Sequence, residues 1–423
     1  MSDEELLLKV EAKFGRVEIL AMREKSHPFE VFGEIGVHFG HDVMGQMYTA
    51  ARLPVFVDGA VVTDAQQGYA LPIGGIAALL KAISPNMVGV DIACMMMVTI
   101  LKIAPGQFME DRESLFEALD SVMSFGNEGF NTPLSHPIMD DPLWKELPHL
   151  FSRTELAIRQ LGTSGGGNHF GNLMIGEVLR EVEWLPLKPG DSFVALMTHS
   201  GSRRVGYDMA RYYHSLATRY TQRVARGVPE DYSWLDINSR DGREYLSVMH
   251  LMGRYARANH ALIHSRFLKE SGLSPLEVGG AKVDVPGFPS FTTLEVVHNF
   301  AWVEGDCVIH RKGATPAHKG KPVIIPGSSG SPSYLGEGLG NPKSLSSCSH
   351  GAGRPFSRTE AKDNHDPKFV KEWMDEHDIL HKGIAPDETV MAYKDIEEVI
   401  RVQAGTLMVP VAKMYPKVTL MGG

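Results

Sequence analysis

Side chains that bind transition metals occur at several places in this chain, each beside an apolar run or a glycine-rich segment. Asp91 and Cys94 lie three residues apart in VGVDIACMMMVTIL, and His169, His199 and His298 stand in similar surroundings. A regular strand directs residues i and i+3 to opposite faces, so Asp91 and Cys94 share a site only where the strand ends or bulges. Carboxylate, thiolate and imidazole together favour Mn, Zn or Fe over Mg or Ca.

Each of these residues also has a purely structural interpretation. Asp91 could cap a turn beside a core cysteine, and the glycines of LGTSGGGNHF (161–170) could form either a phosphate-binding loop or a tight turn. Histidines in apolar strands are often simply hydrogen-bonded. Taken together, however, one thiolate bridging two metals about 3.5–4 Å apart would suit phosphoryl chemistry. The expected phosphate donors around the metals are Asn168, Asn299, Ser328 and Arg203.

A further histidine lies in SCSHGAGR (347–354), where small residues surround His350 and Arg354 follows four positions later. Glycines allow the backbone to approach a ligand closely, and the guanidinium offers a planar fork to phosphate. His350 could bind metal, cap a loop or attack a substrate. Because the metal set is complete without it, we interpret His350 as a nucleophile toward a metal-bound phosphate.

Composition narrows the class of protein. The 423 residues are 43% hydrophobic and 22% charged, which is typical of a soluble globular protein. The net charge of −9 disfavours non-specific coating of nucleic acid but allows a local basic site. Three widely spaced cysteines predict no disulfide framework and a reducing compartment. We find neither a membrane-spanning run nor a signal peptide, and therefore expect a cytoplasmic protein.

Alternating strand-like and helix-like runs predict one compact α+β domain over residues 1–423. The strand-like runs are 88–101, 192–200, 292–303, 321–328 and 406–421. The helix-like runs are 113–123, 206–227, 242–270 and 367–377, and the two long ones predict a helical insertion at about 206–270. The expected loops are 124–142, 228–241 and 328–348.

An ordered set of motifs resembles the RtcB-type RNA-splicing ligases. The motifs are DAQQGYALPIGG (64–75), VGVDIAC (88–94), LGTSGGGNHF (161–170), HSGSR (199–203), HNF (298–300), HRKGAT (310–315), IPGSSGSPSY (325–334), SHGAGR (349–354) and DETVMAYKDI (387–396). The resemblance covers the chain from about residue 30 onward. It implies an α+β fold with mixed sheets, flanking helices and a dinuclear metal cleft.

The resemblance also implies a set of roles. Asp91 and His169 would bind one Mn ion, His199 and His298 the other, and Cys94 would bridge them. His350 would be guanylylated by GTP and pass GMP to an RNA 3′-phosphate, which a 5′-hydroxyl end then displaces. Ends with a 2′,3′-cyclic phosphate are first hydrolysed. The implied process is tRNA splicing or RNA repair, with archease as a helper protein.

Nucleotide-binding positions follow from the same resemblance, as do several departures from the family pattern. The matching positions are Asn168, His169, Phe170, Asn172, His298, Asn299, Pro326, Gly327, Ser328, Ser329, Ser333, His350, Gly351, Ala352, Gly353, Tyr393 and Met421. The departures are Met95, Asn172, Arg204, Ser329 and Met421. Asn172 and Met421 stand where the family reads guanine, so we expect relaxed or altered nucleotide choice, with ATP as an alternative to GTP.

Two other functions compete with the ligase. A dinuclear phosphoesterase would hydrolyse cyclic phosphate ends without nucleotide and would form no adduct. A non-catalytic RNA-end binder would need neither His350 nor the metal set, and any turnover on RNA ends would exclude it.

Overall fold

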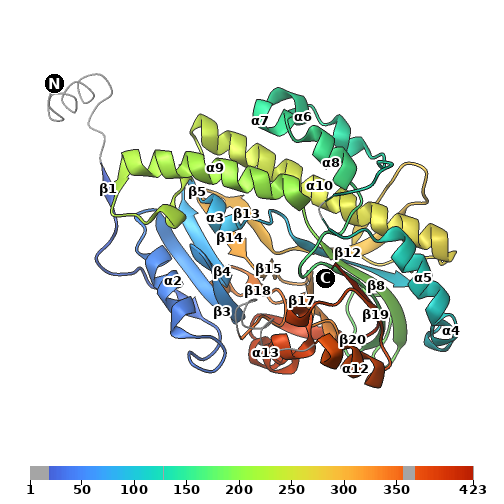
Figure 1. Cartoon of the computed structure of the whole chain (residues 1–423). Helices are drawn as coiled ribbons and strands as arrows, with labels where there is room; N and C mark the ends of the chain where they lie inside the picture. Colours follow the sequence, from blue (N-terminus) through green and yellow to red (C-terminus); the bar gives the residue numbers. More distant parts are fainter. Residues whose placement is uncertain (1–18, 127, 356–366, 423) are drawn as a thin grey trace, which may run out of the picture.

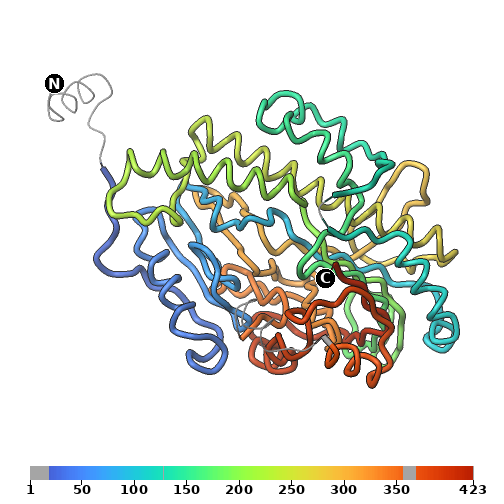
Figure 2. The backbone as a smooth tube through the Cα atoms, in the orientation of Figure 1, coloured from blue at the N-terminus to red at the C-terminus, as the bar shows by residue number. Residues whose placement is uncertain are grey.

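A large mixed sheet carries the histidines of interest. The computed structural model describes residues 19–126, 128–355 and 367–422 (Figures 1 and 2). Within these residues the sheet has nine strands in the order β11-β12-β6-β8-β7-β20-β17-β16, with β19 paired to β20. Their bounds are β6 Met95–Leu101, β7 Phe170–Val178, β8 Ser192–Ser200, β11 Ala281–Val283, β12 Phe291–Val297, β16 Pro322–Ile325, β17 Ser333–Gly338, β19 Leu380–Lys382 and β20 Met408–Met421.

The antiparallel order of four strands brings distant residues to one edge of this sheet. Met95 at the start of β6 is paired with Ser200 at the end of β8 and with Val297 at the end of β12. Phe170 at the start of β7 is paired with His199. Antiparallel neighbours place the start of one strand beside the end of the next. Residues just outside these strand ends therefore converge.

A second, smaller sheet is connected to the first one through His298. Among the described residues it has five strands in the order β13-β14-β4-β3-β2, and a small pair, β15 with β18, leads to His350. The chain passes from the first sheet to the second across His298, between β12 and β13. The bounds are β2 Glu30–Val31, β3 Phe56–Tyr69, β4 Leu71–Leu80, β13 Asn299–Glu304, β14 Cys307–Lys312, β15 Ala314–Pro316 and β18 Ser347–Ser349.

Two long helices lie side by side across the sheets (Figure 1). They are α9 (Arg203–Val224) and α10 (Arg240–Ser271), and α10 buries an apolar face against β6 and β8. The Ser239 hydroxyl caps the start of α10 by accepting from Gly242 N–H at 3.0 Å. The other helices are α2 His41–Ala51, α3 Pro85–Val88, α4 Pro105–Glu110, α5 Arg112–Val122, α6 Leu143–Glu146, α7 Pro148–Phe151, α8 Thr154–Gln160, α12 Pro367–Glu376 and α13 Ile396–Gln403.

Short elements complete the connections. The two-residue strands are β1 Leu20–Ala21, β5 Ala82–Ile83, β9 Ala225–Arg226 and β10 Leu235–Asp236. The 3-10 turns are η1 Pro137–Asp140, η2 Glu230–Tyr232, η3 Pro342–Ser344, η4 Pro386–Glu388 and η5 Val390–Ala392. Within the described residues, we find no helix with the length and apolar character that a membrane crossing requires.

The α+β class is confirmed, and three predicted segments were wrong in detail. The run 88–101 is not one strand, because a turn occupies 89–94 and β6 begins only at Met95. The run 292–303 is split at His298. The expected loop 328–348 contains β17 and the start of β18, because Tyr334 and Leu335 are buried in the core despite the glycines and serines around them. The extent of the domain over 1–423 stays a prediction.

Candidate active site

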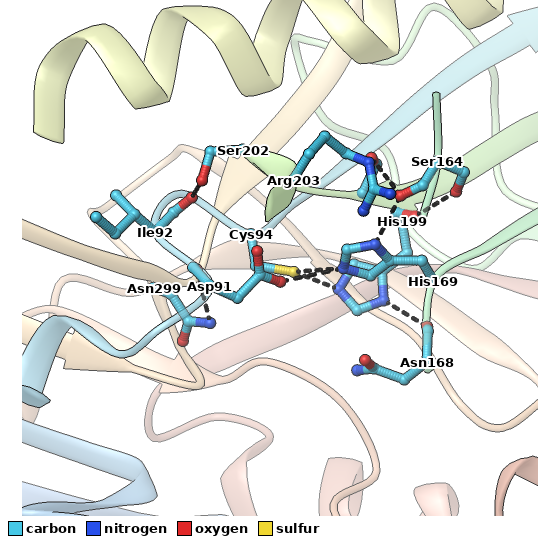
Figure 3. Close-up of polar contacts among 12 residues, drawn as sticks. Asp91, Ile92, Cys94, Ser164, Asn168, His169, His199, Ser202, Arg203 and Asn299 are labelled. Carbon is cyan, nitrogen blue, oxygen red and sulfur yellow. Dashed lines mark hydrogen bonds and ion pairs between the residues drawn. The ribbon is translucent and has the colours of Figure 1, made fainter. Parts of the chain in front are cut away.

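The five candidate metal ligands meet at the converging strand ends. Figure 3 shows four of them, Asp91, Cys94, His169 and His199. The Cys94 Sγ atom lies 3.0 Å from His199 Nε2 and 3.4 Å from His169 Nε2. His169 Nε2 lies 3.1 Å from Asp91 Oδ2, and His199 Nε2 lies 3.2 Å from His298 Nε2. Two groups of three ligand atoms result, and they share the sulfur of Cys94.

A turn brings Asp91 and Cys94, which are three residues apart, to the same site. Both residues precede β6, and the N–H of Cys94 donates to the carbonyl of Asp91 at 3.2 Å. Ala93 adopts a left-handed φ of +58°, which reverses the chain between them. The Asn299 amide donates to the same Asp91 carbonyl at 3.3 Å and accepts from Gly313 N–H at 2.8 Å. The turn is therefore tied to the second sheet.

Backbone carbonyls fix the orientation of two imidazoles. His169 Nδ1 lies 2.7 Å from the carbonyl of Ser164, and His199 Nδ1 lies 3.0 Å from that of Asn168. A carbonyl only accepts, so both Nδ1 atoms carry a proton, and both Nε2 atoms face Cys94. The glycine-rich loop presents these carbonyls, with left-handed φ at Gly165 and Gly167. Its role in the structure is thus to aim two histidines.

Burial disfavours the charged forms of three members of this cluster, His199, His298 and Cys94. It lowers the pKa of His199 and of His298 well below the usual value, and neighbouring histidines lower both further. It raises the pKa of the Cys94 thiol well above its usual value, as does the charge of Asp91. Burial also raises the pKa of Asp91, but its hydrogen bond and attraction to His169 bring it down to about 2.

This donor set fits a pair of transition-metal ions. Neutral imidazoles with free lone pairs, a carboxylate and a thiol that a cation would ionise are the forms that metals bind. His298 Nδ1 is buried without a hydrogen-bond partner among the described residues, and two Nε2 atoms face each other at 3.2 Å. Facing lone pairs repel unless a cation or proton lies near them. The assignment of the metal stays a prediction.

His350 stands beside this cluster and is held by a buried carboxylate. Its ring centroid lies 5.1 Å from that of His298. Asp64 Oδ2 accepts from His350 Nδ1 at 2.6 Å, from His350 N–H at 3.0 Å and from Gly351 N–H at 3.2 Å. The Asp64 side chain is fully buried. The bond assigns the proton to Nδ1 and leaves the lone pair on Nε2.

Our sequence reasoning missed this role of Asp64, although its motif was noted. A carboxylate in the middle of the apolar run of β3 must find partners when it is buried, and that was the available signal.

A cleft of about 1100 Å³ joins the cluster, His350 and most of the predicted nucleotide-binding residues. Its lining includes Asn168, Phe170, His298, Asn299, Pro326, Gly327, Ser328, Ser329, His350, Gly351, Ala352, Gly353, Tyr393 and Met421. Among the metal candidates, Asp91, Cys94 and His199 also face it. The predicted nucleotide-binding residues therefore share one cavity, apart from His169, Asn172 and Ser333.

The remaining predicted residues lie behind the wall of the cleft. His169 belongs to the metal-ligand cluster, and the Ser333 hydroxyl accepts from Gly327 N–H at 3.1 Å. Asn172 is buried opposite Thr419 in β20, and its Oδ1 has no partner within the described chain. Arg203 is buried too, and it donates to Thr163 Oγ1 at 3.0 Å and to the Gly126 carbonyl at 2.6 Å. In the structure Arg203 supports the glycine-rich loop, and its contact with phosphate stays a prediction.

Three cationic side chains lie in the cleft wall, and of these the sequence suggested a phosphate-binding role only for Arg354. Arg354 binds Glu388 and donates to the Tyr393 hydroxyl at 2.8 Å, which fixes the ring of Tyr393. Lys312 Nζ donates to the carbonyls of Tyr69 and Asn86, and burial lowers its pKa to about 7. Lys394 Nζ donates to the carbonyl of Ala65 at 2.7 Å, and burial lowers its pKa to about 8. A metal-ligand cluster next to a carboxylate-supported histidine suits enzymes that transfer phosphoryl or nucleotidyl groups.

Comparisons with known proteins lead to the same class. The family model described as tRNA-splicing ligase RtcB matches residues 46–138 and 145–422. The RNA-splicing ligase RtcB2 of Escherichia coli is 30% identical, over 89% of this chain and 90% of its own length. The tRNA-splicing ligase RtcB of Methanococcus maripaludis is 29% identical, over 90% and 92%. The RNA-splicing ligase RtcB homolog 1 of Entamoeba dispar is 28% identical, over 93% and 84%. The chain therefore belongs to the RtcB family of RNA ligases.

Proposed function

We propose that this protein joins RNA ends bearing a 3′-phosphate or 2′,3′-cyclic phosphate to 5′-hydroxyl ends through a nucleotide bound covalently to His350. The observation that carries the proposal is the 2.6 Å bond between His350 Nδ1 and the buried carboxylate of Asp64, beside the metal-ligand cluster. A pure RNA binder has no use for a histidine with a supported tautomer. Nucleophilic histidines need this support.

The residues of the chain account for the individual steps. His350 Nε2 attacks the α-phosphorus of a nucleoside triphosphate, and pyrophosphate leaves. The Asp64 carboxylate stabilises the positive charge that develops on the imidazole. An oxygen of the RNA 3′-phosphate then attacks the same phosphorus and frees His350. The 5′-hydroxyl finally attacks the activated 3′-phosphate, and the nucleoside monophosphate leaves.

The cofactor we propose is a pair of Mn²⁺ ions held by Asp91, Cys94, His169, His199 and His298. Two such ions supply charge stabilisation for the phosphate oxygens and lower the pKa of a bound water, which suits hydrolysis of the cyclic end. Cys94 would serve both ions, because its sulfur belongs to both groups of ligand atoms.

The nucleotide is GTP by analogy with the family, with ATP as the alternative. The support for ATP is chemical: Met421 lines the cleft with a thioether, and Asn172 behind it offers a neutral amide. Guanine presents two donors that a carboxylate would bind well, and among the described residues the cleft carboxylate of Glu388 is already bound by Arg354. The process served is RNA repair or tRNA splicing, with archease as a candidate helper.

The test is the intact mass of the protein after incubation with Mn²⁺ and each of the four nucleoside triphosphates. We expect a gain of one nucleoside monophosphate with GTP or ATP, and no gain in His350→Ala with normal metal content. His318→Ala, an exposed histidine outside the cleft lining, is the matched control and should form the adduct. No gain with any nucleotide, together with hydrolysis of cyclic phosphate ends, would instead identify a phosphoesterase.

A further inference from the structure

An exposed aromatic ring stands in the wall of the cleft at the tip of a hairpin. Tyr69 ends β3 and is paired with Leu71, the first residue of β4, so that Ala70 forms the tip with a left-handed φ of +59°. The Tyr69 side chain lines the cleft and is 63% exposed. A large aromatic ring exposed inside a functional cleft is typical of a surface that a ligand covers.

The backbone around this ring is held firmly on two sides. The Gln46 amide donates to the Gly68 carbonyl, and its oxygen accepts from Gly68 N–H at 3.0 Å. Lys312 Nζ donates to the Tyr69 carbonyl and lies 5.4 Å from the centroid of the ring. The ring therefore has a fixed base, and a ligand stacking on it would lose little conformational entropy of the protein.

Two lysine side chains lie in the cleft wall near Tyr69. Lys312 and Lys394 bind carbonyls on either side of the hairpin, at Tyr69 and at Ala65. Within the part of the chain that the structure describes, neither lysine forms an ion pair with a carboxylate. Lysine amines that bind only carbonyls can also donate to an anionic ligand, and binding of an anion favours their protonated forms.

The hairpin is close to the reactive centre, and it belongs to a different sheet from Phe170 and Met421. A Cβ atom at Gly313, the residue after Lys312, would lie 3.1 Å from His350 Cε1. Contacts thus connect His350 through Gly313 and Lys312 to the Tyr69 ring. Ser328 and Met421 lie on the loop and strand of the first sheet.

We propose that Tyr69 is a stacking platform for the terminal base of an RNA end, with Lys312 and Lys394 attracting its phosphates. The identity of this ligand rests on the proposed RNA ligase function, whereas the platform itself rests on the ring, its support and the lysines near it. Aromatic rings beside cationic side chains bind single-stranded nucleic acid in this way, with little dependence on sequence.

The experiment compares the affinities of protein variants for RNA probes that have or lack the terminal base. Binding is measured by fluorescence anisotropy with Mn²⁺ and without any nucleoside triphosphate. The probes are short single-stranded RNAs with a 5′-hydroxyl or a 3′-phosphate, each made with and without the base at its terminal nucleotide. The proteins are wild type, Tyr69→Leu and Tyr69→Phe. Tyr415→Leu is the matched control, because Tyr415 is 41% exposed and has Lys413 Nζ at 5.2 Å from its ring but does not line the cleft.

We expect removal of the terminal base to weaken binding to wild type by about five- to 150-fold for one of the two ends. Tyr69→Leu should abolish this difference, Tyr69→Phe should keep it, and Tyr415→Leu should behave as wild type. The proposal is overturned if wild type does not distinguish the probes at either end, or if Tyr69→Leu distinguishes them as wild type does. The His350 adduct is measured separately, so failure of the proposed chemistry is recognised independently of base stacking.

Discussion

The carboxylate of Asp64 offers the sharpest test of how His350 is activated. We consider Asp64→Asn, which keeps the shape of the side chain and removes its charge. In the native site Oδ2 accepts three N–H groups, at 2.6, 3.0 and 3.2 Å. Hydrogen bonds to a charged group contribute about 1.5–3 kcal/mol, against about 0.5–1.5 kcal/mol for neutral ones. The difference for the His350 bond is therefore about 1.5 kcal/mol.

That difference corresponds to a loss of at least about tenfold in the rate of nucleotide transfer to His350. The reason is that the carboxylate stabilises the imidazolium formed in the step, and the amide does so far less well. The substitution should also lower the free energy of unfolding by about 1–3 kcal/mol. Oδ1 is buried without a partner among the described residues, so the new amide N–H groups are unsatisfied in one orientation and face donors in the other.

The assay is the time course of the intact-mass gain at fixed Mn²⁺ and nucleotide, together with metal content and a urea unfolding curve. Asp58→Asn is the matched control, because Asp58 lies on the same strand, is half-buried and does not line the cleft. It should change the rate by less than twofold. A rate for Asp64→Asn within threefold of wild type, at normal metal content, would refute the reasoning and leave Asp64 with a purely structural role.

Two further predictions concern the metal and the pH. Cys94→Ser removes the atom common to both ligand groups, so the metal content of purified protein should fall from two ions to less than one, whereas Cys307→Ser should keep two. Retention of two ions in Cys94→Ser would exclude a bridging sulfur. Burial lowers the pKa of His310 to about 4, and its Nε2 accepts from Ser84 N–H at 3.0 Å. Because the unfolded state binds this proton first, stability should fall as the pH drops from about 6.5 to 4, by up to about 3 kcal/mol from this residue. His310→Gln should remove that part of the slope, and identical pH profiles of unfolding in urea would contradict the assignment.

The metal-ligand cluster is the part of the site that the sequence predicts best. Each histidine adjoins a recognisable strand end, and antiparallel pairing brings such ends together. The spacing of Asp91 and Cys94 required a turn or bulge, and the structure has a turn there. What the sequence could not supply was the order of the strands, which decides that β7 and β8 lie between β6 and β20.

The hydrogen bond between Asp64 and His350 could not be predicted from the sequence, for a different reason. Asp64 is 286 residues from His350 along the chain, and its carboxylate is useful only because β3 runs beside the loop that follows β18. Lys312 and Lys394 likewise bind carbonyls of β3 rather than acids, and such bonds leave no pattern of paired charges in the sequence. The side-chain packing of Arg203 was likewise not predictable from the sequence. This residue begins a helix as predicted, but its side chain fills the space left by Gly165, where a Cβ atom would lie 1.7 Å from Nη1.

The position of β20 in the large sheet has a consequence for how the protein is made. This strand, residues 408–421, lies between β7 and β17, so it is inserted into the sheet rather than added at its edge. During synthesis the edges of β7 and β17 are therefore unpaired until the ribosome has released residue 421, and unpaired edges invite aggregation. The strands that carry the histidines can pair earlier. The strands around the metal-ligand cluster can therefore pair before β20 is synthesised, whereas the cleft wall containing Met421 cannot form until β20 is inserted.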